Sequence, residues 1–197
     1  LTGFKYIGDR IAHYEKTKAY QFIFGYEESY GYLISDFVRD KDAVQASLII
    51  AEAAAYYKYF NKTLYDVLIE LYQKHGWYQE SQVSISGEGA QGAEMIKNLM
   101  ATLREKPLRK IGDLGVIRFE DYNEQKAYEL YKQEHLTLPQ ADVLKYFLSD
   151  GSWIAIRLSG TEAKWKIYYC IAGKDELSLV QKDKHLKEAM SEILKTK

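Results

Sequence analysis

The most constraining feature of the sequence is a pair of apolar, strand-like runs that follow one another near the C-terminus. They read WIAIRL at 153–158 and KWKIYYCIA at 164–172, with a short polar insert between them. Two strands joined by so short a connection run antiparallel, because a parallel pair needs a long crossover connection, usually a helix. The sequence therefore predicts a hairpin, and with it an antiparallel sheet, in this part of the chain.

Further strands and helices precede and follow this hairpin. Strands are expected at SQVSISG (81–87) and GVIRFEDY (115–122), helices at 93–106 and 175–195, and a short helix or helix-to-strand segment at ADVLKYFL (141–148). Because strands and helices are both present and the last two strands are neighbours in sequence, we expect a small α+β domain with an antiparallel sheet, spanning residues 80–197.

Residues 1–79 have a different pattern and are predicted to form a partial α/β domain. A strand is expected to run from residue 21 into a glycine-punctuated loop ending near residue 34, followed by helices at 40–60 and 61–76. The chain begins with LTGFKYIG, which is interpreted as the end of a strand already under way. We therefore interpret the chain as a piece of a longer protein.

Charge and composition exclude several kinds of partner. Lys and Arg number 27 against 28 Asp and Glu, which argues against a nucleic-acid binder that works through a broad basic field. No unbroken apolar stretch is long enough to cross a bilayer, so no membrane contact is expected. The single cysteine, Cys170, rules out an intramolecular disulfide and fits a reducing compartment, so a cytoplasmic location is expected.

The insert of the C-terminal hairpin gathers the groups that bind a phosphate dianion. These are Arg157, Ser159, Gly160, Thr161 and Lys166. A phosphate takes fixed N–H and hydroxyl donors and a guanidinium, and successive N–H groups in a tight turn can form an anion-binding nest. The residues alone leave a second interpretation open, an ordinary polar turn on the surface.

Two shorter patterns lie in the first half of the chain. Glu27 and Ser29 are two residues apart, so one loop can present both to a polyol, although a solvated loop explains the same residues. Lys41 lies between Asp40 and Asp42 at a helix start, where helix capping and surface ion pairs are the simpler explanation. No metal site is expected from these two aspartates, because further ligands are not apparent.

The glycine-rich segment at residues 87–92, GEGAQG, matches the G-x-G-x-x-G dinucleotide pattern between a strand and a helix, with Asp113 about twenty residues on. That fingerprint also needs a βαβ unit in a parallel sheet, whereas the strands that follow look antiparallel. A flexible turn into a helix is therefore the better interpretation.

Four segments together resemble one family, the α-D-phosphohexomutases, which include phosphoglucomutase and phosphomannomutase. RLSGTEAKWKIYY resembles the family's C-terminal phosphate-binding loop, YEESYG its sugar-recognition loop, and TGFKYIG and RDKDA neighbouring segments in the same order. The resemblance spans nearly the whole chain. It implies the back half of domain three followed by domain four, a small α+β unit.

The resemblance implies a binding role for each matching residue. The spectator phosphate would be held by Arg157, Ser159, Gly160, Thr161 and Lys166. The sugar hydroxyls would be bound by Glu27 and Ser29, Lys41 would contact the substrate from the next segment, and Thr2 and Gly3 would line the cleft. The sequence departs from many members at Tyr26, where glycine is common, and at Ala163, where proline is common. The Tyr26 departure leaves the sugar preference open.

The resemblance also implies an activity for the intact protein, the interconversion of glucose 1-phosphate and glucose 6-phosphate through a phosphoserine enzyme and a bisphosphate intermediate. Phosphomannomutase and phosphopentomutase activities remain alternatives. The catalytic serine and the loop that holds Mg²⁺ would lie in N-terminal domains outside this chain, and a hexose bisphosphate would act as activator. The chain alone is then expected to be inactive and to hold no metal.

A second kind of function stays open, a non-catalytic module that binds phosphosugars or other anions. The two alternatives differ in what should precede Leu1, because only a mutase needs an upstream serine loop and an upstream aspartate-rich metal loop.

Overall fold

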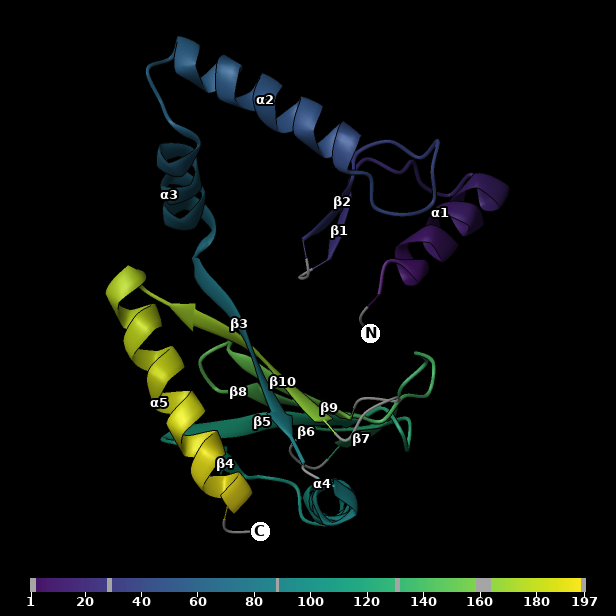
Figure 1. The fold of residues 1–197 in the computed structure, drawn as a ribbon, viewed down its shortest axis with the longest axis vertical. Helices are drawn as coiled ribbons and strands as arrows, with labels where there is room; N and C mark the ends of the chain where they lie inside the picture. The colour runs from purple at the N-terminus through teal and green to yellow at the C-terminus, as the bar shows by residue number, and fades with distance from the viewer. Residues whose placement is uncertain (1–2, 28–29, 88, 130–131, 159–163, 196–197) are drawn as a thin grey trace. The chain divides into compact units, whose positions relative to one another are not determined.

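A computed structural model describes residues 3–27, 30–87, 89–129, 132–158 and 164–195 of the chain (Figure 1). The chain divides into two compact units, Leu1–Lys74 and His75–Lys197. Each unit has its own cluster of buried apolar side chains, and the two clusters share no residue. Residues 75–79 lie in the second unit, whereas the sequence analysis placed the domain boundary after residue 79.

Unit 1 contains helices and one small hairpin. Its elements are α1 (Lys5–Thr17), β1 (Gly25–Glu27), β2 (Gly31–Leu33), α2 (Ala43–Tyr59) and α3 (Leu64–His75). The strands β1 and β2 pair antiparallel. Phe4, Ile11 and Leu33 form a small core against which α1 and β2 pack. The predicted helices at 40–60 and 61–76 are confirmed with shorter bounds.

The start of unit 1 corrects one expectation. The segment around Tyr6 and Ile7 is not the end of a strand but the first turn of α1. Ile7, Ile11 and Tyr14 recur at helical spacing, and Ile11 is buried, so an apolar stripe at the 3.6-residue period decides the structure. The helix ends at Lys18, which adopts a left-handed conformation with φ 54°.

Unit 2 is built on an antiparallel sheet. Among the described residues the sheet has eight strands, with β3, β10, β9, β8, β5, β6 and β7 side by side in that order and β4 paired with β5. The strands are β3 (Trp77–Ser86), β4 (Lys110–Ile111), β5 (Leu114–Asp121), β6 (Lys126–Glu129), β7 (Lys132–His135), β8 (Val143–Leu148), β9 (Trp153–Leu158) and β10 (Lys164–Gly173). The expected α+β architecture is confirmed.

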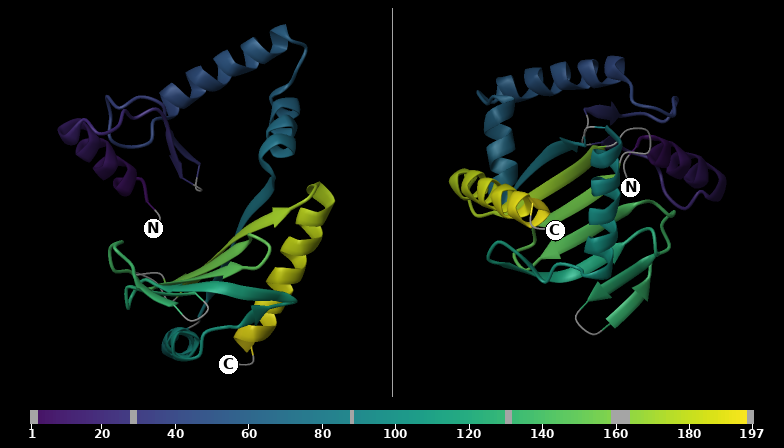
Figure 2. Two further views of the ribbon diagram at one scale, coloured as in Figure 1. Left: turned by 180° about the vertical axis from the view of Figure 1, so that it is seen from behind. Right: turned by 60° about the horizontal axis from the view of Figure 1, so that its bottom comes forward.

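Helices α4 (Gly89–Glu105) and α5 (Glu176–Lys195) both cover one face of this sheet (Figure 2). The core lies between the helices and that face. It includes Ile154, Ile156, Ile167 and Ile171 from the central strands, all at most 1 % exposed. Side chains alternate along a strand, so their sequence neighbours point to the opposite face of the sheet.

Two expectations for unit 2 need correction. Residues 141–148 were expected to form a short helix or a helix-to-strand segment, but Val143–Leu148 is strand β8. Leu144, Tyr146 and Leu148 are fully buried while their neighbours are half-buried, which is the two-residue period of a strand. The hairpin of β6 and β7 was not predicted, because its sequence is polar on both faces.

Candidate functional site

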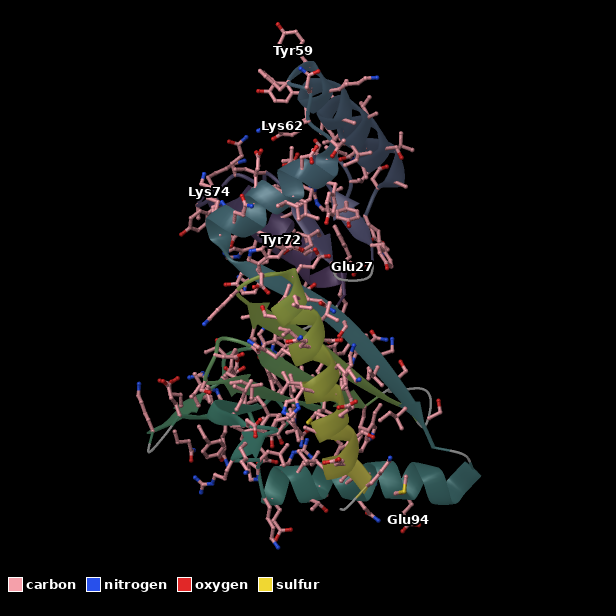
Figure 3. The ribbon with its side chains drawn as sticks, turned by 90° about the vertical axis from the view of Figure 1, so that its left-hand side faces the viewer. Glu27, Tyr59, Lys62, Tyr72, Lys74 and Glu94 are labelled. Carbon is pink, nitrogen blue, oxygen red and sulfur yellow. The ribbon has the colours of Figure 1, made fainter. Side chains whose placement is uncertain are left out.

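The β1–β2 hairpin carries Glu27 at its tip (Figure 3). The Glu27 side chain is only 13 % exposed, and its Oε1 lies 3.7 Å from Nζ of Lys41. The structure thus brings together two residues that the sequence analysis selected from separate segments, a carboxylate that can accept hydrogen bonds from hydroxyl groups and an ammonium that can donate hydrogen bonds to oxygen. Thr2 and Ser29, which were expected beside them, lie outside the described residues.

Lys41 is held from three sides. Its Nζ lies 3.1 Å from Oδ1 of Asp40, and the ring of Phe4 lies 5.8 Å away, within the range of a cation–π contact. The hydrogen bond to Asp40 and, to a lesser extent, the nearby charge of Glu27 raise the pKa of Lys41. Lys41 is therefore a cation at neutral pH. The sequence analysis missed Phe4, because its contact with Lys41 joins two distant parts of the sequence and no local pattern indicates it.

The Lys41 segment is attached to the hairpin through backbone contacts. Asp42 donates its backbone N–H to the carbonyl oxygen of Tyr32 at 2.9 Å. Its carboxylate caps α2 by accepting from the N–H groups of Val44 at 2.8 Å and Gln45 at 3.2 Å. The side-chain oxygen of Gln45 in turn accepts from the backbone N–H of Ser35 at 2.8 Å. This network fixes Lys41 relative to the strand that pairs with Glu27.

Gly31 is a further part of this arrangement that the sequence analysis did not select. A Cβ atom at this position would lie 2.6 Å from Oε1 of Glu27 and 2.8 Å from Cδ of Lys41. Any side chain here would therefore displace both functional groups. Gly3, which was expected to line the cleft, has φ 120°, a conformation that favours glycine.

The second group of predicted site residues lies at the loop end of the β9–β10 hairpin. Arg157 and Lys166 are direct cross-strand partners, and both are exposed. They lie on the face opposite α4 and α5, because their neighbours Ile156 and Ile167 are buried in the core. Ser159, Gly160 and Thr161 lie outside the described residues, so their predicted role in phosphate binding remains an expectation.

Arg157 and Lys166 place two cationic residues opposite each other on neighbouring strands. Like charges directly opposite each other in a sheet destabilise it. A dianion between the two side chains would turn this repulsion into two attractive contacts, and the guanidinium can bind phosphate oxygens in a bidentate manner.

The same face of the sheet carries a lysine that the sequence analysis did not select. Nζ of Lys145 lies 4.1 Å from the ring centroid of Trp153 and 4.6 Å from that of Phe147. Burial lowers the pKa of Lys145, and the charge of Glu120 acts in the opposite direction. Lys145 and Phe147 are two residues apart, so in a strand both lie on one face. This spacing is the sequence signal by which Lys145 could have been selected.

The glycine-rich segment at 87–92 has a structural role. The strand β3 before it pairs antiparallel with β10, so the parallel βαβ unit of a dinucleotide site is not formed. Helix α4 begins at Gly89, and a Cβ on Gly92 would lie 2.5 Å from the carbonyl carbon of Gly87. The expectation that a helix follows this segment is confirmed.

Within the described ranges, no three His, Cys, Asp or Glu side chains come together in a way that could hold a metal ion. Among the described residues, therefore, no ligand set for Mg²⁺ is present. None of the helices in the described part of the chain is long and apolar enough to cross a membrane.

Comparison with known proteins follows the same division of the chain. Residues 1–75 match the family model "Phosphoglucomutase/phosphomannomutase, alpha/beta/alpha domain III". The chain is 42 % identical over 170 residues to a phosphoglucomutase of Staphylococcus haemolyticus, covering 85 % of this chain and 30 % of that protein. It is 37 % identical over 184 residues to a phosphoglucomutase of Staphylococcus aureus strain MRSA252, covering 92 % and 33 %.

A solved structure shows the same fold. The open form of pp63/parafusin, a phosphoglucomutase from Paramecium, matches with a TM-score of 0.59 at 20 % identity, over 95 % of this chain and 32 % of that one. The chain spans about a third of the length of these relatives. Residues 1–75 thus match domain III of the phosphoglucomutase/phosphomannomutase family, and over most of its length the chain is similar to phosphoglucomutases.

Proposed function

We propose that the chain is the sugar- and phosphate-binding part of a phosphohexomutase, and that the intact protein is a phosphoglucomutase. The observation that carries the proposal is the Glu27–Lys41 pair, held 3.7 Å apart at the end of the β1–β2 hairpin. The relatives cited above are named phosphoglucomutases, which favours glucose phosphates over mannose or pentose phosphates as substrates.

The Glu27 carboxylate would recognise the sugar through its hydroxyl groups. A carboxylate accepts two adjacent hydroxyl groups, and hydrogen bonds to a charged group contribute about 1.5–3 kcal/mol each. Because the side chain is largely shielded from water, these bonds would compete with few water molecules. Lys41 would donate to a sugar or phosphate oxygen from the same side. Ser29 and Thr2 would add hydroxyl donors.

Arg157 and Lys166 would hold the phosphate that does not react. The guanidinium would supply a bidentate contact and the ammonium a point charge, while Ser159, Gly160 and Thr161 would supply N–H and hydroxyl donors. A clamp that recognises phosphate alone accepts either end of a sugar bisphosphate. That property suits a reaction in which the intermediate must turn around before it returns a phosphoryl group.

The remaining parts of the reaction are proposed to lie outside this chain. These are the serine that carries the phosphoryl group, the residues that bind Mg²⁺ and the contacts to a bisphosphate activator. The residues of this chain bind and orient the substrate and exclude water around the sugar hydroxyls. A cytoplasmic location remains a prediction.

The test is an activity measurement on the full-length protein that contains this chain. We expect turnover of glucose 1-phosphate to glucose 6-phosphate in a coupled assay with Mg²⁺ and glucose 1,6-bisphosphate. Mannose 1-phosphate and ribose 1-phosphate, assayed in parallel, decide between the three sugar classes. Binding of sugar phosphates without turnover of any of them would instead favour a non-catalytic phosphosugar-binding module.

A further inference from the structure

One face of the unit 2 sheet carries aromatic and cationic side chains together. Helices α4 and α5 both cover the other face (Figure 2), and among the described residues of unit 2 no helix covers this one, called the outer face below. Each of the three neighbouring strands β8, β9 and β10 presents one ring and one cation on it: Phe147 and Lys145, Trp153 and Arg157, and Tyr168 and Lys166. A sheet face that is free of helices and carries aromatic rings is a surface on which proteins stack nucleotide bases.

The strand register arranges the outer face in rows that run across the strands. One row consists of the direct cross-strand neighbours Ser84, Lys166 and Arg157. The next row consists of Gln82, Tyr168 and Ala155. Residues on one face of a strand follow one another at about 6.8 Å, so the row with the ring lies that far from the row with the cations. This spacing is comparable to the separation of phosphate and base in a nucleoside 5′-monophosphate.

The row with the ring offers a flat surface and a hydrogen-bonding edge. Tyr168 is half-buried, so part of its ring is accessible to a ligand. Its partner on β9, Ala155, has only a methyl group, which cannot cover the ring. Its partner on β3, Gln82, is exposed, and the Gln82 side-chain Nε2 donates to Oγ of Ser84 at 3.2 Å. A glutamine amide both donates and accepts, and it can pair with N6 and N7 of adenine.

The positive charge of the outer face is confined to one patch, which favours a single nucleotide over a nucleic-acid strand. Glu120, the direct cross-strand partner of Lys145, has its two carboxylate oxygens engaged at 2.8 Å by Arg118 and at 2.7 Å by the hydroxyl of Tyr122. Glu120 therefore offsets the charge of Lys145 only in part. Glu80 lies beyond the patch on β3, and the whole chain has a net charge of −1. A long polyanion would be repelled there, whereas one nucleotide would contact the cations alone.

We propose that the outer face binds adenosine 5′-monophosphate (AMP), with the phosphate between Arg157 and Lys166 and the adenine ring stacked on Tyr168. The Gln82 amide would pair with the edge of the base. The nucleotide would occupy the two cations proposed above for the substrate phosphate, so AMP and sugar phosphate would exclude each other from unit 2. The inference rests on the proposed phosphate role of Arg157 and Lys166, but not on mutase activity.

The test is calorimetric titration of the 197-residue chain with inorganic phosphate, ribose 5-phosphate and AMP. Ribose 5-phosphate has the phosphate and the sugar of AMP but no base. We expect AMP to bind at least about 10-fold more tightly than ribose 5-phosphate, within the range for stacking of a base on an aromatic side chain. In NMR spectra, AMP should shift the backbone amides of Gln82 and Tyr168, and glucose 1-phosphate should reverse these shifts by competition.

Variants separate base stacking from phosphate binding. Tyr168→Ala should abolish the preference for AMP over ribose 5-phosphate and leave the affinity for inorganic phosphate unchanged. Tyr168→Phe should retain the preference, because the ring remains. Tyr78→Ala is the matched control and should bind AMP as the parent does, since Tyr78 is 48 % exposed on the same face but lies four residues from Gln82 along β3.

The outcomes distinguish this inference from the proposed function. Equal affinities for AMP and ribose 5-phosphate, or a Tyr168→Ala variant that still prefers AMP, would overturn the inference and leave the phosphate site in place. A short oligoadenylate that binds at least about 100-fold more tightly than AMP would also overturn it, because a nucleic-acid strand would then be the occupant. If neither inorganic phosphate nor AMP binds, the proposed phosphate role of Arg157 and Lys166 fails together with the inference.

Discussion

Replacing Lys166 by glutamine should stabilise unit 2 in chloride and weaken its response to phosphate. Arg157 and Lys166 are direct cross-strand partners, so their charges repel. Like charges directly opposite each other in a sheet are expected to cost about 0.2–1 kcal/mol. For a unit of this size, removing this cost should raise Tm by about 1–4 °C.

In phosphate, the parent protein should instead have a higher Tm than Lys166→Gln. Bound phosphate stabilises the folded state, and the parent protein should bind it more tightly by the contribution of one charge-assisted contact, about 1.5–3 kcal/mol. Unfolding can be followed by tryptophan fluorescence, because Trp77, Trp153 and Trp165 all lie in unit 2. Lys184→Gln, which loses only an exposed ion pair, is the control. The reasoning is refuted if Lys166→Gln lowers Tm in chloride, or if phosphate stabilises both proteins equally.

Four further predictions concern the sugar site, stability at low pH and the isolated chain. In the full-length protein, Glu27→Ala should lower kcat/KM for glucose 1-phosphate about 10- to 150-fold, with little change in inhibition by inorganic phosphate. Gly31→Ala should cause a similar loss, because its Cβ would lie 2.6 Å from the Glu27 carboxylate, and a wild-type kcat/KM would contradict that geometry. Burial opposes ionisation of Asp150, yet Lys182 at 2.6 Å holds the pKa of Asp150 below its usual 3.8. This stabilisation is present above pH 3.8 and lost as the pH falls below it, so Asp150→Asn should flatten the acid limb of a Tm-against-pH curve, and an unchanged limb would argue against it. Finally, the 197-residue chain alone should show no mutase turnover above an enzyme-free blank.

The sequence predicted the β9–β10 hairpin of unit 2 because its core-facing residues recur at every second position. Ile154 and Ile156 are buried while Arg157 is exposed, and this period identified both the hairpin and the face that carries the cations. Residues 141–148 were expected to form a short helix or a helix-to-strand segment but contain strand β8, and the β6–β7 hairpin was not predicted. Its ordering comes in part from Arg118, whose NH1 lies 3.2 Å from Glu129 and 3.0 Å from Glu134. Ion pairs across strands leave no local hydrophobic signal.

Unit 1 was predicted less well, for a physical reason. Residues 21–24 have a strand-like sequence but no strand partner among the described residues. The Glu27–Lys41 pair could be selected from the sequence, since both residues belong to short motifs. Phe4 and Gly31, which lie against this pair, could not be selected from the sequence, because their contacts with it form only in the folded chain.

The central claim is that this chain recognises a sugar phosphate through one site for phosphate and another for the sugar. It is tested most directly by following backbone amides by NMR while inorganic phosphate or glucose 1-phosphate is added. The account predicts that both ligands shift amides within residues 157–166, that only glucose 1-phosphate also shifts amides near Glu27 and Lys41, and that Arg157→Ala weakens phosphate binding about 10- to 150-fold. Shifts that map outside residues 157–166, or unchanged binding by Arg157→Ala, would contradict it.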